Sequence, residues 1–229
     1  MDISRAFSYI FDDEAWIGKL VMIVVWSLVS VIPLFGLVGV AALAGYTVEL
    51  LANMRRGVSS PLPEWDNLGD KIGDGANVLI AALVYNMGNF VLLCGVFLLL
   101  PSYGDGGGSS SMAGGALAIT CCLMIFVIIY NVLIWPVLAV GTLRYAQMRQ
   151  ISVFFQFGEL WDTLNRHMGL TLQWLLFSIF ASLVISFFNI IPCIGWVASM
   201  ALVVPVQGHL LGQFGLLMGE KPKNKPKRG

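Results

Sequence analysis

Residues 17–51, IGKLVMIVVWSLVSVIPLFGLVGVAALAGYTVELL, decide the fold, because they are apolar almost throughout and are interrupted at Pro33. A helix needs about 20 residues to cross the roughly 30 Å hydrocarbon core of a bilayer, so one continuous helix over this stretch would be too long to cross once. Proline ends a helix and glycine tolerates the backbone of a corner, and Pro33 and Gly36 stand close together near the middle of the stretch. The stretch therefore predicts two membrane-spanning helices joined by a tight turn.

Four more apolar stretches follow, and a second proline–glycine turn, from Pro192 to Gly195, separates the last two. Residues 101–115 are rich in glycine and serine, which predicts an exposed loop between the third and fourth spans. We therefore predict an all-α integral membrane protein in which six transmembrane helices form three helical hairpins. The predicted spans are residues 17–32, 34–51, 76–100, 113–140, 168–191 and 194–218, which form a single membrane domain over 1–218, and residues 219–229 are a disordered basic tail.

The composition agrees with a membrane protein, since 58% of the 229 residues are hydrophobic and only 11% are charged. Soluble domains carry roughly 25% charged residues. The formal net charge is zero, so no global field draws nucleic acid toward the chain, and no nucleic-acid partner is expected. The cysteines lie in or beside apolar stretches without paired C-x-x-C spacing, which is typical of small core residues rather than of a metal or redox site. They are Cys94, Cys121, Cys122 and Cys193.

The positions of the basic residues predict the orientation. All 13 lysines and arginines fall before or at the start of the first span, in the loops 52–75 and 141–167, or in the tail, and the turns around Pro33, Gly107 and Pro192 contain none. With six spans the two groups of segments lie on opposite sides of the membrane, and cytoplasmic loops carry the excess of lysine and arginine. We therefore expect a multi-pass protein of the plasma membrane with its N- and C-termini in the cytoplasm.

Two segments on the cytoplasmic side have the spacing of amphipathic helices. Over residues 151–168 the apolar positions recur at helical spacing with charged residues between them, and residues 3–11 repeat this pattern. Such helices lie in the membrane interface with the apolar face down. Aromatic–aspartate pairs at 11–12, 65–66 and 161–162 also indicate a weak threefold repeat, each unit a surface helix followed by a two-helix hairpin.

The most distinctive polar segment is Pro61-Leu62-Pro63-Glu64-Trp65-Asp66, in the loop after the second span. The prolines hold the residues before them in extended backbone, Trp65 is expected to anchor the loop at the interface, and the two acids are expected to meet Arg55, Arg56 or Lys71. Two interpretations remain open: a site that docks a partner or a lipid headgroup, or a rigid connector whose acids cap the next helix and neutralise nearby cations. The candidate docking residues are Arg55, Arg56, Pro61, Pro63, Glu64, Trp65, Asp66 and Asp74.

Several of these residues carry a family resemblance. The Gly45-Tyr46 pair, the arginines at 55 and 56, the run 61–66 and the Asp74-Gly75 pair together resemble the domain-of-unknown-function 4013 family, and Phe11-Asp12, Trp16 and Lys19 fit its opening. Members of that family are uncharacterised multi-span membrane proteins of bacteria and archaea. The resemblance therefore implies a fold and a location, and it brings no activity, substrate or catalytic residue with it.

A further group of polar side chains falls inside or at the edges of the predicted spans: Tyr46, Glu49, Asn86, Asn89, Asn131 and His209. Glu49 follows Pro33 by sixteen residues, or about 24 Å of helix, and His209 lies similarly far after Pro192, so both are expected near the cytoplasmic face. The amides are expected deeper in the bilayer. Amides there commonly hydrogen-bond neighbouring helices, although a polar path through the membrane would use the same residues.

The tail points to membrane lipids as a partner of the cytoplasmic face. Five cations close to the membrane attract anionic headgroups, at about 1 kcal/mol each. They are Lys221, Lys223, Lys225, Lys227 and Arg228. Other membrane subunits, or further copies of the chain, are the remaining partners that the sequence allows.

Enzyme signatures are missing from the sequence, which has no H-E-x-x-H, G-x-S-x-G or phosphate-binding loop. We therefore name no catalytic, cofactor-binding or metal residue, and we expect a non-enzymatic structural or accessory subunit that organises helices, lipids or partners. One alternative is a small-solute transporter or channel component with Asn86, Asn89 and Asn131 along its path. A further alternative is an interfacial lipid-modifying enzyme acting through Glu64, Asp66, Asp70 and Asp74.

Overall fold

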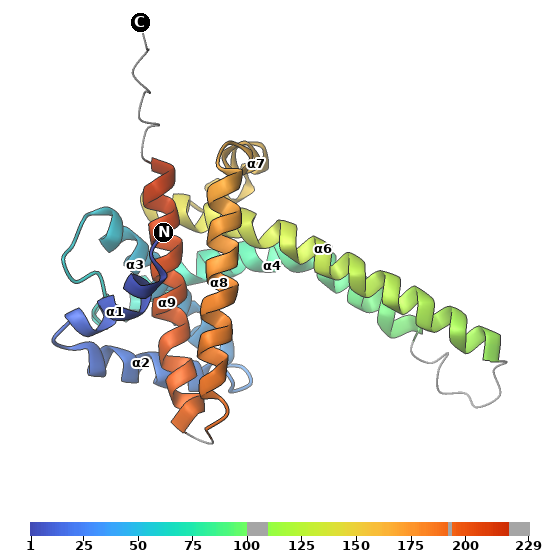
Figure 1. Ribbon diagram of the computed structural model, residues 1–229, viewed down its shortest axis with the longest axis horizontal. Helices are drawn as coiled ribbons and strands as arrows, with labels where there is room; N and C mark the ends of the chain where they lie inside the picture. Colours follow the sequence, from blue (N-terminus) through green and yellow to red (C-terminus); the bar gives the residue numbers. More distant parts are fainter. Residues whose placement is uncertain (100–109, 192–193, 220–229) are drawn as a thin grey trace, which may run out of the picture.

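The computed structural model of the chain describes residues 1–99, 110–191 and 194–219, and within these ranges it contains helices and turns but no strand. The elements in chain order are α1 Ile3–Ser8, η1 Tyr9–Asp12, α2 Trp16–Val29, α3 Gly36–Arg55, α4 Leu68–Leu99, α6 Ser110–Met148, η2 Ile151–Phe155, α7 Phe157–Arg166, α8 Met168–Phe188 and α9 Ile194–Gly219 (Figure 1). The all-α fold class is therefore confirmed. The turn at Pro192, most of the glycine-rich loop and the basic tail lie outside the described residues.

Five helices in the described part of the chain, α3, α4, α6, α8 and α9, are long and apolar enough to cross a membrane. The remaining predicted span, residues 17–32, corresponds to α2, which has only 14 residues. That is about 21 Å of helix, short of the roughly 30 Å of a hydrocarbon core. The apolar run is longer than the helix because Ser30 to Phe35 form the turn before α3, so hydropathy overstated the length of this helix.

The other helices extend beyond the apolar cores from which they were predicted. α3 continues to Arg55, α4 begins at Leu68 rather than at 76, and α6 runs to Met148 rather than to 140. The added turns carry polar and charged residues, which hydropathy excludes even where they are helical. The predicted loop is wrong at residues 110–112, which are the first residues of α6, so the predicted fourth span began three residues late. Pro136 lies inside α6 without ending it.

α3 lies at the centre of the molecule and packs against α2, α4, α6 and α9, most extensively against α4. Two glycines let the backbones of α3 and α4 touch. A Cβ atom at Gly45 would overlap the carbonyl oxygen of Lys71, and a Cβ atom at Gly75 would overlap that of Ala41. Small residues allow membrane helices to approach in this way, so this contact fixes where α4 starts relative to α3.

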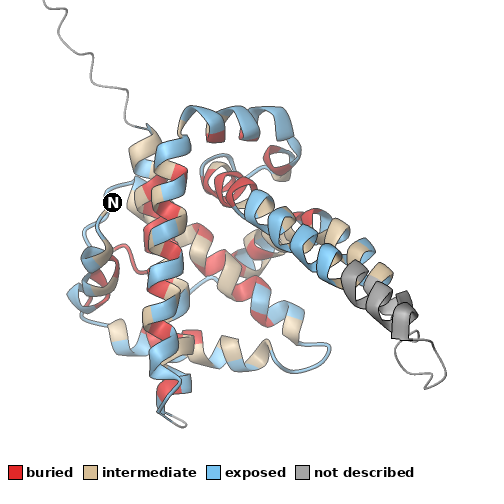
Figure 2. Cartoon of the chain, turned by 45° about the vertical axis from the view of Figure 1, so that its right-hand side comes forward, coloured by how far each residue is buried: buried red, intermediate tan, exposed pale blue. Residues whose placement is uncertain are grey.

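Two helix pairs give the molecule its shape (Figure 1). α8 and α9 run side by side and pack closely, whereas α4 and α6 run side by side and extend away from them. We call the α4–α6 pair the arm and the remaining helices the body. Burial is concentrated in the body and in the parts of α4 and α6 that pack against it, while the described part of the arm beyond them is largely exposed (Figure 2).

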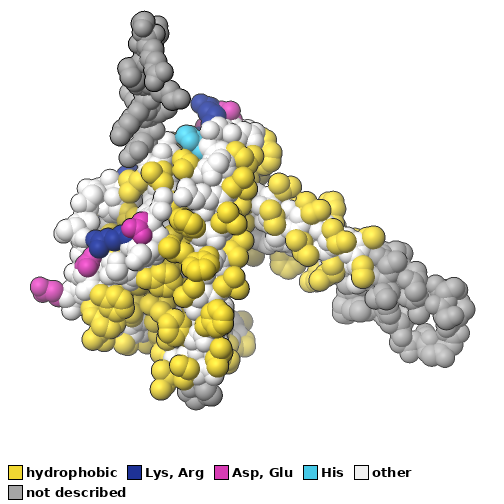
Figure 3. Space-filling view, in the orientation of Figure 1, with side chains coloured by type: hydrophobic (Ala, Val, Ile, Leu, Met, Phe, Trp, Pro, Cys, Tyr) yellow, Lys and Arg dark blue, Asp and Glu magenta, His cyan; other side chains and the backbone are white. Residues whose placement is uncertain are grey.

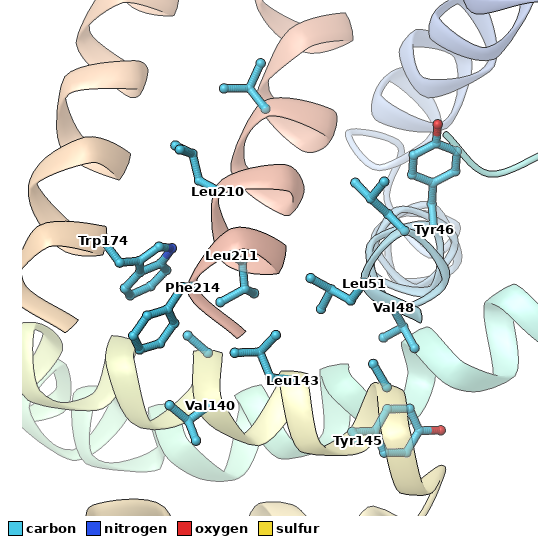
Figure 4. Close-up of a cluster of buried hydrophobic side chains, with 14 of the residues drawn as sticks. Tyr46, Val48, Leu51, Val140, Leu143, Tyr145, Trp174, Leu210, Leu211 and Phe214 are labelled. Atoms are coloured by element: carbon cyan, nitrogen blue, oxygen red, sulfur yellow. The ribbon is translucent and has the colours of Figure 1, made fainter. Parts of the chain in front are cut away.

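The buried core lies where α3, α6, α8 and α9 meet (Figure 4). Tyr46, Val140 and Phe214 are each at most 1% exposed, and Trp174 stacks on Phe214 with ring centroids 5.5 Å apart. The outer face of the arm is exposed although it is apolar (Figure 3). Because lipid tails are as apolar as leucine, such a face needs no cover from the protein in a bilayer.

The predicted surface helix is present as η2 and α7, which follow the end of α6. Leu160 and Leu164 of α7 are buried against the protein, whereas Phe157 and Trp161 are about half exposed. The amphipathic helix is therefore confirmed. Its apolar residues, however, do not all face the same way. Leu160 and Leu164 pack against the end of α6, whereas Phe157 and Trp161 face outward.

The N-terminal pattern also forms short helices, of which α1 packs on α9. The side chain of Asp2 caps α1 by accepting a hydrogen bond from the backbone N–H of Arg5, 3.1 Å long. The middle unit of the predicted repeat has no such helix, since residues 56–67 are turns, bends and irregular chain. The threefold repeat is therefore wrong in that unit.

Candidate functional site

The segment around Trp65 is packed into the body. Pro61 and Pro63 are buried, and the side chain of Asn53 donates a hydrogen bond to the carbonyl of Pro61 at 3.0 Å. The Trp65 ring stacks on Tyr46 with centroids 4.8 Å apart. The rigid-connector interpretation therefore accounts for the two prolines and the tryptophan, because they pack this segment against α3.

Trp65 also joins α3 to α2. Its ring lies 6.4 Å from that of Trp26, nearly parallel to it, and its Nε1–H donates a 3.0 Å hydrogen bond to the carbonyl of Lys19. The residue that was expected to anchor the loop in the membrane interface is thus used inside the protein. A bulky ring with one polar edge suits this position, since it fills the gap between two helices and satisfies a carbonyl at the same time.

A buried ion pair lies beside the Trp65 segment. The Nζ of Lys19 is 2.7 Å from Asp13 and 2.6 Å from Glu64, and it also donates to the carbonyl of Leu62 at 3.0 Å. The side chains of Lys19 and Asp13 are only 6% exposed. Because a charge removed from water is costly unless it is paired, these bonds hold the Trp65 segment against the start of α2.

Asp13 is poised to remain ionised. Burial by itself would raise the pKa of this carboxyl, but hydrogen bonds from Lys19, Ser60 and a backbone N–H outweigh burial and hold its pKa below the usual value. The sequence pattern did not identify this pair, because Lys19 was counted only as a cation that orients the first span. An isolated lysine inside an apolar run, with an acid six residues before it, is the signal that could have revealed it.

A second cluster surrounds Lys71 at the start of α4, and this lysine is 3% exposed. Its Nζ lies 2.5 Å from Glu49 and 3.6 Å from Asp66, and it donates to the carbonyl of Asp66 at 3.1 Å. The expected pairing of Asp66 with Lys71 is therefore confirmed. The expectation that Glu64 would meet a cation of the same loop is wrong, since Glu64 pairs with Lys19 of α2, a helix whose position the sequence does not give.

The two arginines of the motif make no ion pair in the described part of the chain. Arg56 donates to the side-chain oxygen of Asn53 at 2.5 Å, and Arg55 lies at the exposed end of α3. Asp74 belongs to a third cluster: it accepts a 2.9 Å hydrogen bond from Tyr145 and forms an ion pair with Arg149. This cluster ties α4 to the end of α6.

Two open clefts lie among these clusters. One, of about 570 Å³, is lined by residues that include Asp66, Asp70, Asp74 and Arg149, and the other, of about 620 Å³, is lined by residues that include Asp13, Glu64 and Asp66. Asp66 lies on both. No group of three or more histidines, cysteines, aspartates or glutamates in the described ranges is arranged to hold a metal ion. Three of the four acids of the enzyme alternative therefore share one cleft, whereas Glu64 lines the other. All of them except Asp70 form ion pairs within the described residues.

The deep amides form one network between the helices of the arm. Asn89 donates to Asn86 at 2.8 Å and to Asn131 at 3.1 Å, while Asn131 donates to Asn89 at 3.0 Å and to the carbonyl of Val127 at 2.8 Å. An amide nitrogen has two hydrogens, so the donors of Asn89 and Asn131 are all used. This network joins α4 to α6 and favours the helix-packing interpretation over a polar path.

His209 and Tyr46 are also packing residues. His209 is 6% exposed and stacks on Tyr9 with centroids 4.1 Å apart, while Tyr9 donates to the carbonyl of Pro205 at 2.9 Å. These contacts fasten the N-terminal helices to α9. Tyr46 is completely buried, and its hydroxyl has no hydrogen-bond partner among the described residues. The five cations of the tail lie outside the described residues.

The fold and the clusters together define an all-helical protein with five helices, in the described ranges, that could each cross a membrane. A family model described as "Protein of unknown function (DUF4013)" matches residues 17–194. The chain belongs to this family, as the motifs around Gly45, the arginines and the proline-rich run indicated. The match covers most of the chain, including the ion-pair residues Lys19 and Lys71 and the amides of the arm. Comparison with curated proteins and with solved structures finds no match.

Proposed function

We propose that the protein is a non-enzymatic accessory subunit of the plasma membrane, which organises lipids or other membrane subunits around its arm. The observation that supports this proposal is that the buried charged groups form ion pairs within the chain. Lys19, Lys71 and Asp74 each bind acids or cations of the same chain and so fasten one segment to another. These groups hold the fold together, and the apolar surface of the arm is the surface that we propose engages a partner.

The proposed topology has six crossings, arranged as three hairpins, with both termini in the cytoplasm. It is supported by the basic residues, which are absent from the stretches of sequence around Pro33, Gly107 and Pro192. The short α2 would be the sixth crossing. A helix shorter than the hydrocarbon core crosses by local thinning of the bilayer, at a cost of fractions of a kcal/mol per Å of mismatch.

Cysteine labelling tests this topology. After removal of the four native cysteines, Gly107→Cys should react with a membrane-impermeant maleimide on intact cells, whereas Lys225→Cys should react only after permeabilisation. Glu14→Cys, on an exposed residue just before α2, separates six crossings from five. Protection of Glu14→Cys on intact cells supports the crossing of α2. Labelling of Gly107→Cys and Lys225→Cys from the same side would contradict the arrangement as a whole.

The transporter alternative finds less support in the arm. A translocation path needs polar groups that can release their partners, and the amide donors of Asn89 and Asn131 bind each other and a backbone carbonyl. The enzyme alternative finds less support because Glu64 pairs with Lys19 and Asp74 with Arg149, so these carboxylates are already used in holding the fold together. The accessory role requires neither transport nor catalysis.

Native mass spectrometry after gentle extraction from the membrane tests the accessory role. We expect a stoichiometric companion, either another membrane subunit or a second copy, that is lost on Phe90→Ala and retained on Phe180→Ala. The two phenylalanines are matched, since Phe90 on the arm is 57% exposed and Phe180 on α8 is 55% exposed. Equal loss in both variants, or a wild-type monomer without a companion, would contradict the proposal.

A further inference from the structure

An apolar cavity of about 380 Å³ opens in the angle between the arm and the body. Its walls come from five helices, α3, α4, α6, α8 and α9. The lining residues include Thr47, Val78, Trp135, Thr142, Trp174, Val203, Val204 and Gln207. Apolar side chains cover both sides of this angle (Figure 3). A cavity of this size lies within the range of small-ligand pockets, about 300–1,000 Å³, and its lining suits a hydrocarbon chain.

The cavity opens sideways, toward the region that lipid would fill. Trp135 and Val203, both lining residues, are 42% and 39% exposed. The cavity also lies at a defined depth along α8. Trp174 follows the first residue of α8, Met168, by six positions, which is about 9 Å of helix. Because the surface helix α7 ends just before α8, the proposed membrane placement puts Trp174 near the boundary between headgroups and hydrocarbon, where the chains of a glycerolipid join the glycerol.

A polar group without a partner lies in the wall of this cavity. Trp174 is only 3% exposed, and its indole Nε1–H has no hydrogen-bond partner in the part of the chain that the structure describes. The nitrogen-bearing edge of the ring is turned toward α9 (Figure 4), which supplies the opposite wall. A buried donor left unpaired is costly, and the side-chain oxygens in the lining, on Thr47, Thr142 and Gln207, make no hydrogen bond with it. The donor therefore points to a ligand with an acceptor oxygen.

We infer that this cavity binds one chain of a bilayer glycerolipid, with the carbonyl oxygen of the ester that joins the chain to glycerol accepting a hydrogen bond from Trp174. Nε1 is covered by protein in this structure, so the indole turns slightly when the oxygen enters. The inference rests on the proposed membrane placement and goes beyond it by naming a bound lipid and its contacts. It also specifies the accessory role: the protein would hold a lipid between the arm and the body.

Lipid retention measured by native mass spectrometry tests the inference. Purified, delipidated protein in detergent is titrated with dioleoylphosphatidylcholine, and we expect one molecule to be retained per chain at low lipid ratios. Val204→Phe, which places a ring in the cavity, should lower the retained fraction at least tenfold. Val197→Phe is the matched control, because Val197 lies on the same helix and is 51% exposed outside the cavity; its retention should equal that of the wild type. Equal retention by the two variants would overturn the cavity as the site.

The donor is tested separately with Trp174→Phe, which keeps an aromatic ring and removes the N–H. Loss of one neutral hydrogen bond should weaken binding by about three- to tenfold. The loss should be smaller with the diether counterpart of the same lipid, because an ether oxygen accepts more weakly than an ester carbonyl. No loss with the ester lipid, or an equal loss with both lipids, would remove Trp174 as the donor.

Vesicle flotation separates this inference from the proposed function. Wild type, Val204→Phe and Val197→Phe should all float with dioleoylphosphatidylcholine vesicles and elute as single species from size exclusion. If the wild type does not float, the membrane placement itself fails, and the inference fails with it. If all three proteins float and retain lipid equally, the placement stands and the bound lipid alone is refuted.

Discussion

Replacing Gly45 with alanine will separate α3 from α4 and sharply reduce the yield of folded protein. The Cβ atom that alanine adds would overlap the backbone carbonyl of Lys71, and a backbone atom within a helix cannot rotate away as the end of a side chain can. Overpacking of a close contact costs about 1–3 kcal/mol and occasionally more. We expect the upper end of this range, because the only relief is a shift of the whole of α4. Gly75→Ala should behave in the same way, since its added atom meets the carbonyl of Ala41.

Gly73→Ala is the matched control for this prediction. Gly73 lies on the same helix as Gly75, and nothing lies within 4 Å of a Cβ atom added there. Alanine favours the helix over glycine by about 1 kcal/mol, so this variant should be unchanged or slightly more stable. The measurements are the monodisperse fraction and the thermal midpoint in detergent. If Gly45→Ala and Gly75→Ala unfold at the same thermal midpoint as Gly73→Ala, α3 and α4 are not in backbone contact.

The glycine contact also shows what the sequence could and could not predict. Gly45 and Gly75 are visible in the sequence as members of two short motifs, but a motif does not say which helix each glycine touches. The helices themselves were predictable, since a span must satisfy its backbone internally and present apolar side chains to lipid. α2 was the exception, because the count of apolar residues could not distinguish helix from the turn at Ser30 to Phe35.

The candidate site was predictable in its residues and not in its pairings. Trp65 and its neighbours were recognised because two prolines, an aromatic ring and two acids rarely stand together. Their partners come from distant parts of the chain: Lys19 lies 45 positions before Glu64, and Tyr145 lies 71 positions after Asp74. Only the tertiary arrangement brings such groups together. The same holds for Trp174, which in the sequence is one of seven tryptophans and in the structure is a buried donor without a partner among the described residues.

Lys19→Met should be the most destabilising single change of a charged residue. Methionine keeps an unbranched side chain but leaves Asp13 ionised, buried and without its cation. Removing one partner of a buried ion pair costs about 3–5 kcal/mol. Arg166→Ala is the comparison, because Arg166 forms an exposed pair with Asp162 one turn away in α7, and exposed pairs of this kind contribute about 0.3–0.5 kcal/mol. Unfolding by denaturant titration in detergent, followed by tryptophan fluorescence, measures both.

A second substitution and a pH titration distinguish the effect of losing the ion pair from the effect of losing packing. Asp13→Asn added to Lys19→Met removes the unpaired charge, so the double variant should recover part of the lost stability. The pKa of Asp13 is held below its usual value, so its ionised form contributes stability that is present above the unfolded pKa of about 3.9 and is lost as the pH falls through the folded value. The wild type should therefore weaken below about pH 4 more steeply than the double variant, which has no carboxylate at this position. A Lys19→Met variant as stable as Arg166→Ala, with the acid dependence of the wild type, would mean that Asp13 and Lys19 do not form a buried pair.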